Sequence, residues 1–577
     1  MRSWSRRRRV ITSAVVLVCL WGAVVSVLLV LAALSLASGS DRLADVRAEA
    51  NVADLTAPET TERLDAAEAD FASADAKLSN PVVAPAKLVP VLGRQVRAME
   101  RLASSGETGA AAASTAVGEV DELADRSREG GPARVAMLRD LSGVAGTLHD
   151  ELAGIDVGSA DGLVGPLADA VTEADEGQRS ATRGAQRLGD ASTGLADLFE
   201  GPSSYLLIGA NNGEMRAGSG MFLSAAELRF EDGKATLGDV RPTADLVLPE
   251  GTVTAEGDLQ ANWGWLDPGR DLRQLGVTAD FPQSAATAVR TWEAIPGNGP
   301  VDGVIVIDVD GIRSLLRAVG PVEVDGVTYT ADDVRGKLLR EQYQRYEDDR
   351  EERRDVLGDV AKVIFERIEA GDWELGDLAT QLTGATTSRH LMVWSKDDPL
   401  QTTWADLAAD GHLRSDSLAI NLVNRSANKL DSWIDTTADV ATERQADGTT
   451  ELTVTYRIRN RSNGEGPTYL VGPAIEGLAA GDYRGLVVTN LPAGTTDVQV
   501  TGTEPFLEGG DGPTVVRAGE VTVPAGGSAE VVVTATLPKG LDQLVIEPSA
   551  RIPRTEWTID GDTPKSERRR TVPLSAD

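Results

Sequence analysis

The chain has 577 residues, enough for three or four domains of ordinary size. Its 89 acidic residues outnumber its 56 basic residues and give a formal net charge of -33 at pH 7. This balance argues against binding to nucleic acid, because the phosphates would be repelled. Cys19 is the only cysteine and only three histidines are present. An intrachain disulfide and a cysteine-histidine zinc site are therefore excluded, whereas a cation held by carboxylates is not.

Residues 10–37 carry no charge. As a helix of about 42 Å they would be long enough to cross a bilayer. Arg6–Arg9 precede this run, and the segment after it has mixed charge. The positive-inside rule therefore predicts a cytoplasmic N-terminus at 1–9, a single transmembrane helix at 10–37 and an extracytoplasmic remainder. A cleavable signal peptide is the alternative, but its apolar core normally has only about 7–15 residues.

Residues 41–200 are predicted to form an extracytoplasmic helical bundle or stalk. Apolar residues recur there at alternating steps of three and four, the spacing of one helix face. Two such faces are Leu64, Ala67, Phe71, Ala74 and Leu78, and Leu138, Leu141, Ala145, Leu148 and Leu152. Prolines and the sequence REGGPAR interrupt the pattern, which favours several antiparallel helices over one continuous coil.

Residues 201–425 are predicted to form an α/β domain. The first expected strands are Tyr205–Gly209, Met221–Phe230 and Ala235–Val240, and EDGK is a hairpin turn between the last two. After its first strand the chain is expected to leave the sheet as a polar, glycine-rich loop, NNGEMRAGSG. A polar loop that follows a strand is a common place for a binding site in α/β folds.

The sequence VDGVIVIDVDGIRSLLRAVGPVEVDG at 301–326 indicates a strand, a helix and a second strand, with the strands at Val304–Ile307 and Val322–Val324. This order predicts a right-handed βαβ unit and therefore a parallel sheet. Thr330 and Asp333 have the spacing of a helix N-terminus, with the threonine as its cap. A long, charged helix is expected to follow them.

The region 432–548 is predicted to be a β-sandwich. Short segments such as ELTVTYRIRN and AEVVVTATLP alternate or run apolar, with Gly, Pro and Asn between them, which is typical of an immunoglobulin-like sandwich. Residues 549–577 are polar and are predicted to be a disordered tail. The expected fold is therefore multidomain, with a transmembrane helix, a helical stalk, an α/β domain and a C-terminal sandwich.

Six polar side chains near the ends of the early strands are candidate ligand-binding residues. They are Asn211, Asn212, Glu214, Arg216, Arg241 and Asp245. Arginine can bind a phosphate or carboxylate with two hydrogen bonds, and backbone N–H groups of a glycine-rich turn can join it. The alternative is structural, because Asn212-Gly213 is a common turn dipeptide and a Glu214–Arg216 ion pair would hold the loop.

No catalytic residue or metal ligand is assigned from the sequence. The chain contains no nucleophile elbow, no Walker loop and no dinucleotide-binding fingerprint. A conventional hydrolase, kinase or dehydrogenase is therefore not expected. The acid pair Asp308 and Asp310 is expected to end a strand and cap a helix, because carboxylates act as a catalytic pair only where they converge in space.

Five segments resemble, in order, the bacterial family catalogued as domain of unknown function 4012, whose members are membrane-anchored and extracytoplasmic. They are PVLGRQVRAMERL (90–102), YLLIGANNGEMRAGSGMF (205–222), NWGWLDPGRDLRQLGVTADFPQSA (262–285), VDGVIVIDVDGIRSLLRAVGPVEVDG (301–326) and NLVNRSANKLDSWI (421–434). The resemblance is spread over most of the chain.

A fainter resemblance is to the core of LytR-CpsA-Psr proteins, in the first strand with its polar loop, the hairpin and VDGVIVIDVDGIRSLLRAVGPVEV. Proteins of that family are single-pass membrane proteins that bind a polyprenyl pyrophosphate and transfer wall glycopolymers to peptidoglycan, usually with Mg²⁺. The resemblance implies a LytR-CpsA-Psr-like α/β domain. VRPTADL (240–246) is similar to the family's proline-arginine-aspartate turn, although here the arginine precedes the proline.

The expected function is that of a membrane-anchored extracytoplasmic protein of cell-envelope assembly, which binds a glycan or a lipid-linked pyrophosphate precursor. One alternative is an active glycopolymer transferase, with Arg216 and Arg241 on the phosphates and an acid holding Mg²⁺. The other is a non-catalytic envelope scaffold. The expected partners are the cell membrane and a lipid-linked glycan or cell-wall polymer, with no nucleic acid.

Overall fold

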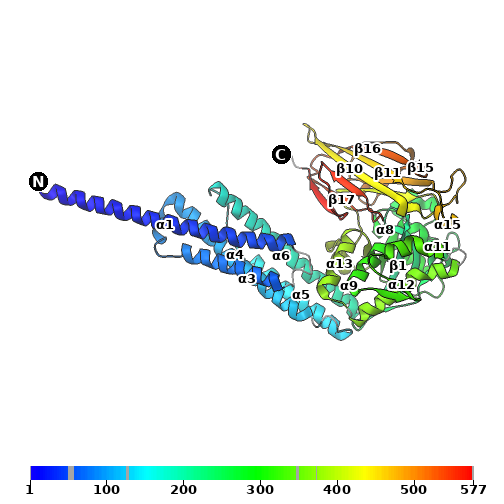
Figure 1. The fold of residues 1–577 in the computed structure, drawn as a ribbon, viewed down its shortest axis with the longest axis horizontal. Coiled ribbons are helices and arrows are strands. Elements are labelled where there is room, and N and C mark those ends of the chain that lie inside the picture. The colour runs from blue at the N-terminus through cyan, green and yellow to red at the C-terminus, as the bar shows by residue number, and fades with distance from the viewer. Residues whose placement is uncertain are drawn as a thin grey trace. The chain divides into compact units, whose positions relative to one another are not determined.

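The computed structural model describes residues 2–49, 58–124, 126, 129–345, 350–371 and 373–574. The chain divides into two compact units, residues 1–127 with 136–195 and residues 128–135 with 196–577. The first unit contains the long helices drawn in blue and cyan in Figure 1. The second contains a mixed sheet with its helices and a β-rich C-terminal region.

The first unit is built of long helices, as the spacing of its apolar residues predicts. They are α1 (Arg2–Glu49), α3 (Pro58–Leu78), α4 (Pro90–Ala124), α5 (Pro132–Ala153) and α6 (Gly165–Glu200). The predicted apolar face of α3 is buried along its whole length, from Leu64 to Leu78. Phe71 on this face packs closely on α4, where a Cβ at Gly106 would lie 2.5 Å from the phenyl ring. Only glycine permits this approach.

Helix α1 contains the candidate membrane span. Among the residues that the structure describes, one helix is long and apolar enough to cross a membrane, over Leu20–Val46, with a mean hydropathy of 2.4. The predicted span at 10–37 thus lies inside a longer continuous helix. The side chains of residues 1–19, including Arg6–Arg9 and Cys19, lie outside the described part of the structure.

The second unit begins with a mixed sheet in the order β3-β2-β1-β5-β8, with β4 paired to β2. Its strands are β1 (Ser203–Met215), β2 (Gly220–Glu231), β3 (Lys234–Leu237), β4 (Arg241–Pro242), β5 (Gly303–Ile307) and β8 (Leu391–Ser395). Strands β1 and β5 run parallel, and the other pairs are antiparallel. The predicted hairpin between β2 and β3 is confirmed. Its turn residues Asp232 and Gly233 both have positive φ, as a type I′ turn requires.

The predicted βαβ unit at 301–326 is wrong. Strand β5 leads into helix α9 (Val309–Val319), but the next strand, β6 (Val322–Val324), pairs with β7 (Val327–Tyr329) in a separate antiparallel hairpin. Asp325 and Gly326 have φ values of 49° and 73°, so this Asp-Gly dipeptide reverses the chain at once and keeps β6 out of the sheet. The parallel partner of β5 is β1.

The predicted helix start at Thr330 is confirmed. The N–H of Thr330 donates to Asp333 Oδ1 at 2.9 Å, and the N–H of Asp333 donates to Thr330 Oγ1 at 3.3 Å, which is a reciprocal capping arrangement. The helices in this part of the chain are α7 (Gly257–Trp263), α8 (Phe281–Ala294), α10 (Val334–Gly336), α11 (Gln342–Arg345), α12 (Arg350–Ala370), α13 (Leu375–Thr387) and α14 (Asp398–Asp406), with a π-helical turn at Lys337–Glu341.

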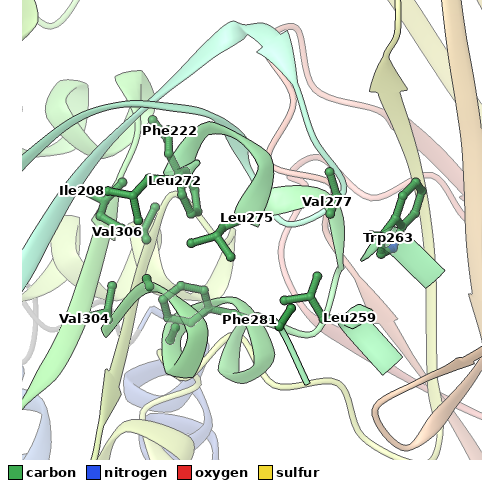
Figure 2. Close-up of a cluster of buried hydrophobic side chains, with 14 of the residues drawn as sticks. Ile208, Phe222, Leu259, Trp263, Leu272, Leu275, Val277, Phe281, Val304 and Val306 are labelled. Atoms are coloured by element: carbon green, nitrogen blue, oxygen red, sulfur yellow. The ribbon is translucent and has the colours of Figure 1, made fainter. Parts of the chain in front are cut away.

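Helices and turns cover both faces of the mixed sheet. On one face, Ile208 of β1 and Val304 of β5 belong to the same buried cluster as Leu275 and Phe281 (Figure 2). Leu275 lies in a 3-10 turn before α8, and Phe281 is the first residue of α8. On the other face, Ile307 packs against the hydrophobic cluster that α9 and α12 form. The sheet is therefore the centre of a layered core, as an α/β domain requires.

The C-terminal region consists of two sheets that share one hydrophobic core. One sheet has the order β13-β16-β11-β10-β18 and the other the order β14-β15-β12-β9-β17-β19. The strands are β9 (Ser417–Asn424), β10 (Ile434–Arg444), β11 (Thr450–Asn460), β12 (Tyr483–Leu491), β13 (Thr496–Thr501), β14 (Glu504–Asp511), β15 (Thr514–Val523), β16 (Ser528–Leu537), β17 (Gln543–Glu547), β18 (Glu556–Ile559) and β19 (Arg570–Pro573). A short helix, α15 (Thr468–Val471), lies between β11 and β12.

Strand β9 is buried on both faces, and this moves the predicted domain boundary. Leu418 belongs to the core between the two C-terminal sheets, whereas Val423 belongs to the core beneath the mixed sheet, together with Val488 of β12. The β region therefore begins at Ser417, inside the predicted α/β domain of 201–425 and earlier than the predicted start at residue 432. Because both faces of β9 are apolar, its sequence lacks the apolar-polar alternation by which a half-exposed strand is recognised.

The tail predicted to be disordered, residues 549–577, is structured through residue 574. Strand β18 pairs with β10 and strand β19 pairs with β17. Trp557 and Ile559, on the same face of β18, are 5% and 6% exposed. Polar residues surround these few apolar positions, so the composition of the segment resembles that of a disordered tail. Residues 575–577 lie outside the described part of the chain.

Candidate functional site

The polar stretch after Gly209 does not leave the sheet. Strand β1 continues to Met215, and its pairing with β2 shifts register between Gly209 and Ala210 and again between Asn211 and Met215. The predicted polar loop is therefore mainly a bulged strand. A bulge changes the direction of side chains along a strand, and here the polar side chains are buried. Asn211 is 3% exposed, and Asn212 is fully buried.

The two asparagines bind distant parts of the chain. The side chain of Asn211 donates to the Tyr343 hydroxyl at 2.9 Å. The side chain of Asn212 donates to Asp308 Oδ2 at 2.7 Å and to the carbonyl of Ala550 at 2.8 Å. Both amides are therefore occupied by protein partners that follow them by about a hundred residues or more in the sequence.

Glu214 and Arg216 form a buried charged group with Lys429. The Glu214 carboxylate accepts from Lys429 Nζ at 2.9 Å and lies 3.3 Å from Arg216 Nη2. The ammonium of Lys429 also faces the rings of Tyr343 and Tyr469, at 5.8 Å and 5.6 Å from their centres. Burial alone would raise the pKa of Glu214, but Lys429 and Arg216 outweigh it and lower that pKa. The Glu214–Arg216 pair expected from the sequence is present, with an additional lysine.

Asp431, which sequence reasoning did not single out, is the most connected acid of this region. It accepts from Arg551 Nη1 at 2.9 Å, from the Tyr483 hydroxyl at 2.9 Å, from the backbone N–H of Met215 at 3.0 Å and from the Asn424 side chain at 2.8 Å. The side chains of Asp431 and Arg551 are 0% and 1% exposed. The hydrogen bond from Met215 to Asp431 joins the end of β1 to the C-terminal β region, and the Arg551 ion pair holds Asp431 in place there.

Arg241 lies apart from Arg216. Strand β4 pairs with β2, and Arg241 lies opposite Ala225. Arg216 follows Met215, which lies opposite Gly220, the first residue of β2. Five residues separate these two points on β2, a distance of about 16 Å in an extended strand. The two arginines therefore do not act on one small group.

Arg241 has its own partners, and Asp245 is at the surface. The guanidinium of Arg241 donates to Asn298 Oδ1 at 2.5 Å and stacks on the Trp292 ring, 4.9 Å from its centre. Asp245 ends the short 3-10 turn Thr243–Asp245 and is exposed. Of the six candidate residues, the structure thus brings Glu214 and Arg216 into direct contact.

Asp308 caps helix α9, the structural role that its position in the sequence predicts. Its Oδ1 accepts from the backbone N–H groups of Asp310 and Gly311, both at 3.0 Å. Asp308 is 1% exposed and lies just past the carboxyl end of β5, beside the end of the parallel strand β1. The carboxyl ends of parallel strands are a common place for binding sites in α/β folds.

His390 completes this second group of charges. Its Nδ1 lies 2.7 Å from Asp308 Oδ2, and its Nε2 lies 3.7 Å from Asp310 Oδ2. Asp310 in turn pairs with Arg335. Burial opposes protonation of the ring, but the two carboxylates outweigh it and raise the pKa of His390 to about 9. The histidine is therefore positively charged at neutral pH and donates to Asp308.

We expect the contribution of His390 to stability to depend on pH. Its folded pKa of about 9 lies above the ordinary histidine value of 6.5, so the stabilisation is full below about pH 6.5 and is lost as pH rises through 9. The difference in unfolding free energy between wild type and His390→Gln should therefore shrink by about 3 kcal/mol across this interval. Urea unfolding of both proteins at several pH values, followed by tryptophan fluorescence, measures it. A difference that does not change with pH would contradict the expectation.

Trp265, Phe506 and Arg425 form an exposed surface, here called the aromatic shelf. The side chains of Trp265 and Phe506 are 53% and 39% exposed, and their rings meet edge to face with centres 5.9 Å apart. The Arg425 guanidinium lies 4.7 Å from the centre of the Trp265 ring. Beneath the shelf, the buried ring of Trp263 stacks on Phe506 at 6.4 Å. Two tryptophans two residues apart in NWGWLD therefore have opposite environments.

Two further arginines, Arg216 and Arg484, lie near Arg425, each with an acidic partner. Burial lowers the pKa of Arg425, and the neighbouring Arg216 and Arg484 lower it further, while Glu520 opposes them. The Nε of Arg425 is buried and has no hydrogen-bond partner among the described residues. A buried donor of this kind is normally paired; the Nε atom itself is closed to solvent, whereas the Arg425 side chain as a whole is half-buried.

The described residues contain no candidate metal-binding group, and one apolar cavity near β1 is small. Within the described residues, no group of three or more His, Cys, Asp or Glu side chains could hold a metal ion. An apolar cavity beside Gly209, lined also by Ser224 and Leu357, has a volume of about 20 Å³. This is room for about one water molecule and is far too small for a prenyl chain.

Residues 200–343 match the family described as "Protein of unknown function (DUF4012)". No curated protein matches the chain. Among solved structures, the chain is similar to one described as a "putative nutrient binding protein" from Legionella pneumophila, with 9% identity and a TM-score of 0.16. That match covers 25% of this chain and 54% of the other, so this chain spans about half of that protein's length. A likeness this weak carries no argument about fold or function.

The family match contains β1, β2 and β5, the parallel strand ends with Asn212 and Asp308, and Trp265 of the aromatic shelf. It ends at Tyr343, the residue that binds Asn211. Residues 200–343 are therefore similar to the family described as protein of unknown function (DUF4012).

Proposed function

We propose that the protein is anchored in the cell membrane by α1, with its bulk on the extracytoplasmic side, and serves envelope assembly by binding a glycan. The candidate span of α1 and the arginines that precede it support this location. The surplus of acidic residues suits a soluble exterior.

The aromatic shelf is the observation that carries the binding proposal. Sugar rings have apolar C–H faces, which pack on aromatic rings that are exposed and held rigidly. Trp265 and Phe506 offer such rings, and the half-buried guanidinium of Arg425 beside them offers a positive charge for a carboxylate or phosphate. The ligand chemistry that fits is a saccharide that carries a negative charge, either free or linked through pyrophosphate to a lipid.

An active LytR-CpsA-Psr-like transferase has less support. That chemistry would need Arg216, Arg241 and an acid holding Mg²⁺ to converge on the same phosphates. Arg216 is 6% exposed and paired with Glu214, whereas Arg241 binds Asn298.

The non-catalytic scaffold remains a second candidate. Burial of Asn211, Asn212 and Arg216 favours it, because these side chains bind other segments of the same chain.

Replacing Trp265 with alanine is expected to weaken binding of an acidic oligosaccharide by at least about tenfold, or about 1.4 kcal/mol, because exposed aromatic anchors dominate binding energy. Arg425→Gln should remove the preference for acidic over neutral oligosaccharides. Titration calorimetry on the full-length protein in detergent, with a uronic-acid oligosaccharide, its neutral analogue and a polyprenyl pyrophosphate, measures both effects. Arg457→Gln, on the exposed side of β11, is the matched control and should bind as wild type does.

Two results would count against the glycan proposal. One is the absence of binding by all three probes, which would leave the scaffold as the better account. The other is unchanged affinity in Trp265→Ala and Arg425→Gln, which would place any glycan site away from the shelf.

A further inference from the structure

The connection between α3 and α4 exposes an unusual amount of apolar surface. Its sequence from residue 80 to 93 is NPVVAPAKLVPVLG, and it includes a 3-10 turn at Ala84–Leu88. Its exposed apolar side chains, here called the apolar tip, are Val82, Leu88, Val89 and Val91, which are 39%, 86%, 45% and 71% exposed. Contiguous apolar surface on a chain this acidic indicates a contact with another apolar phase.

The apolar tip lies beside the membrane candidate α1. Trp21 Nε1 donates to the carbonyl of Val82 at 2.8 Å. Further along α1, Ser35 accepts from Lys77 Nζ at 3.0 Å, and farther still Arg42 pairs with Asp70 at 3.0 Å. Helix α3 therefore runs antiparallel to α1, and its C-terminal end, with the tip, is on the side of Trp21.

The length of α1 gives the depth of the tip. If Arg9 lies at the inner surface, a hydrocarbon core of about 30 Å ends about 20 residues later, near residue 29, and the rest of the span at 10–37 lies in the interfacial layer above it. Trp21 is then about 12 Å below the outer surface, whereas Ser35 is about 9 Å above it. The polar contacts of Lys77 and Asp70 thus fall outside the membrane, and the apolar tip falls in the outer leaflet.

The backbone of the tip is suited to lipid. Irregular chain in a bilayer must satisfy its own hydrogen bonds. The N–H groups of Val83, Ala86, Val89 and Gly93 donate within the segment, to the carbonyls of Asn80, Val83, Ala86 and Val89. The N–H of Val82 donates to the Asn80 side chain. Prolines at positions 81, 85 and 90 have no N–H to satisfy.

Charges at the base of the tip match a headgroup layer. Arg94, Arg97 and Arg101 are exposed on the first turns of α4 at spacings of three and four, which puts them on one side of the helix. Lys87 is paired with Glu100. A local surplus of arginine in a chain of net charge -33 complements the phosphates of a membrane surface, and long basic side chains reach the interface from below it.

We propose that the apolar tip is embedded in the outer leaflet beside α1, so that the helical unit is held to the membrane at two adjacent points. The proposal rests on the proposed membrane location of α1. It adds that the α3–α4 connection is a lipid-contacting element and that Arg94, Arg97 and Arg101 meet lipid phosphates. Two points of attachment restrict rotation of the unit relative to the bilayer, which a single helix does not.

The test compares three nitroxide-labelled cysteines in the full-length protein with Cys19 replaced by serine. The positions are Leu88→Cys in the tip, Val24→Cys on α1 as the membrane reference and Leu188→Cys on α6 as the control. Leu188 is an exposed leucine of the same unit, about 35 Å along α6 from its first residue. Accessibility to oxygen, which concentrates in lipid, and to a water-soluble nickel complex is measured by electron paramagnetic resonance. The vesicles contain phosphatidylcholine and phosphatidylglycerol.

We expect residues 24 and 88 to be accessible to oxygen and shielded from nickel, and residue 188 to show the reverse. Shielding at 24 with nickel access at 88 would overturn the tip proposal while α1 remains anchored. Protection of 88 from both reagents would indicate a protein contact, such as a second copy, and would also overturn it. Nickel access at residue 24 would refute the membrane location itself, and the tip proposal with it.

Discussion

Asp431→Asn is expected to destabilise the second unit by about 3–5 kcal/mol, because it leaves the buried charge of Arg551 without a counter-charge. The substitution also places an amide where two donors, the N–H of Met215 and the Asn424 side chain, now meet a carboxylate oxygen. At least one donor would lose its acceptor, and an unsatisfied buried group adds its own penalty. Urea unfolding of the full-length protein in detergent, followed by tryptophan fluorescence, measures the loss.

Asp439→Asn is the matched control for this experiment. Asp439 pairs with Arg457 on an exposed part of the sheet, where the two side chains are 44% and 52% exposed. Exposed pairs contribute about 0–1 kcal/mol, so this variant should stay close to wild type. Equal effects of the two substitutions would contradict the idea that burial makes the Asp431–Arg551 pair important.

Lys429→Met is expected to cost about 3 kcal/mol, because the buried carboxylate of Glu214 loses its closest cation. Arg216 remains 3.3 Å from Glu214, which keeps the expected loss below that of Asp431→Asn. The double variant Glu214→Gln with Lys429→Met tests the coupling of the two residues, since it removes the charges of the closest ion pair and leaves Arg216 as the remaining buried charge of the group. The same unfolding assay applied to both single variants and the double variant measures this coupling.

The single and double variants together distinguish a structural role of Glu214 from a role in ligand binding. If Glu214 acts as a structural partner of Lys429, the effects of the single variants will be far from additive. Additive losses would contradict a structural pair and would return Glu214 to the set of candidate ligand-binding residues. Arg229→Gln, in a pair on β2 whose arginine side chain is 59% exposed, is a surface control with little expected effect.

Local pattern was sufficient to predict the elements that have one buried face. The face from Leu64 to Leu78 was predicted because its spacing is that of a helix, and all of it is buried. The hairpin at Asp232-Gly233 and the cap at Thr330 were predicted because the dipeptide and the capping pair are local features. The turn at Asp325-Gly326 is also a local feature, but the strand-helix-strand order alone predicts the wrong sheet for β6.

The partners of the candidate residues could not be predicted from one sequence. Asn212 meets the carbonyl of Ala550, and Asp431 meets Arg551, across more than a hundred residues of chain. Their pairing depends on how β9 and the C-terminal strands pack on the mixed sheet, which no local pattern encodes. The prediction of a polar loop at 211–220 rests on its polar, glycine-rich composition, but most of this stretch continues strand β1 as a bulge.

The burial of β9 on both faces has a consequence for truncation studies. Because β12 pairs with β9 and contributes side chains to both hydrophobic cores, excising the strands that follow residue 432 would remove part of the covering of the mixed sheet and leave β9 without this partner. Such a deletion would yield a misfolded or degraded product, and its phenotype would say nothing about a docking role of the β region. Substitutions of surface side chains are therefore better suited to genetic studies of the β region. The turn at 445–448, whose residues 446 and 447 are exposed, is a safer place for an inserted epitope.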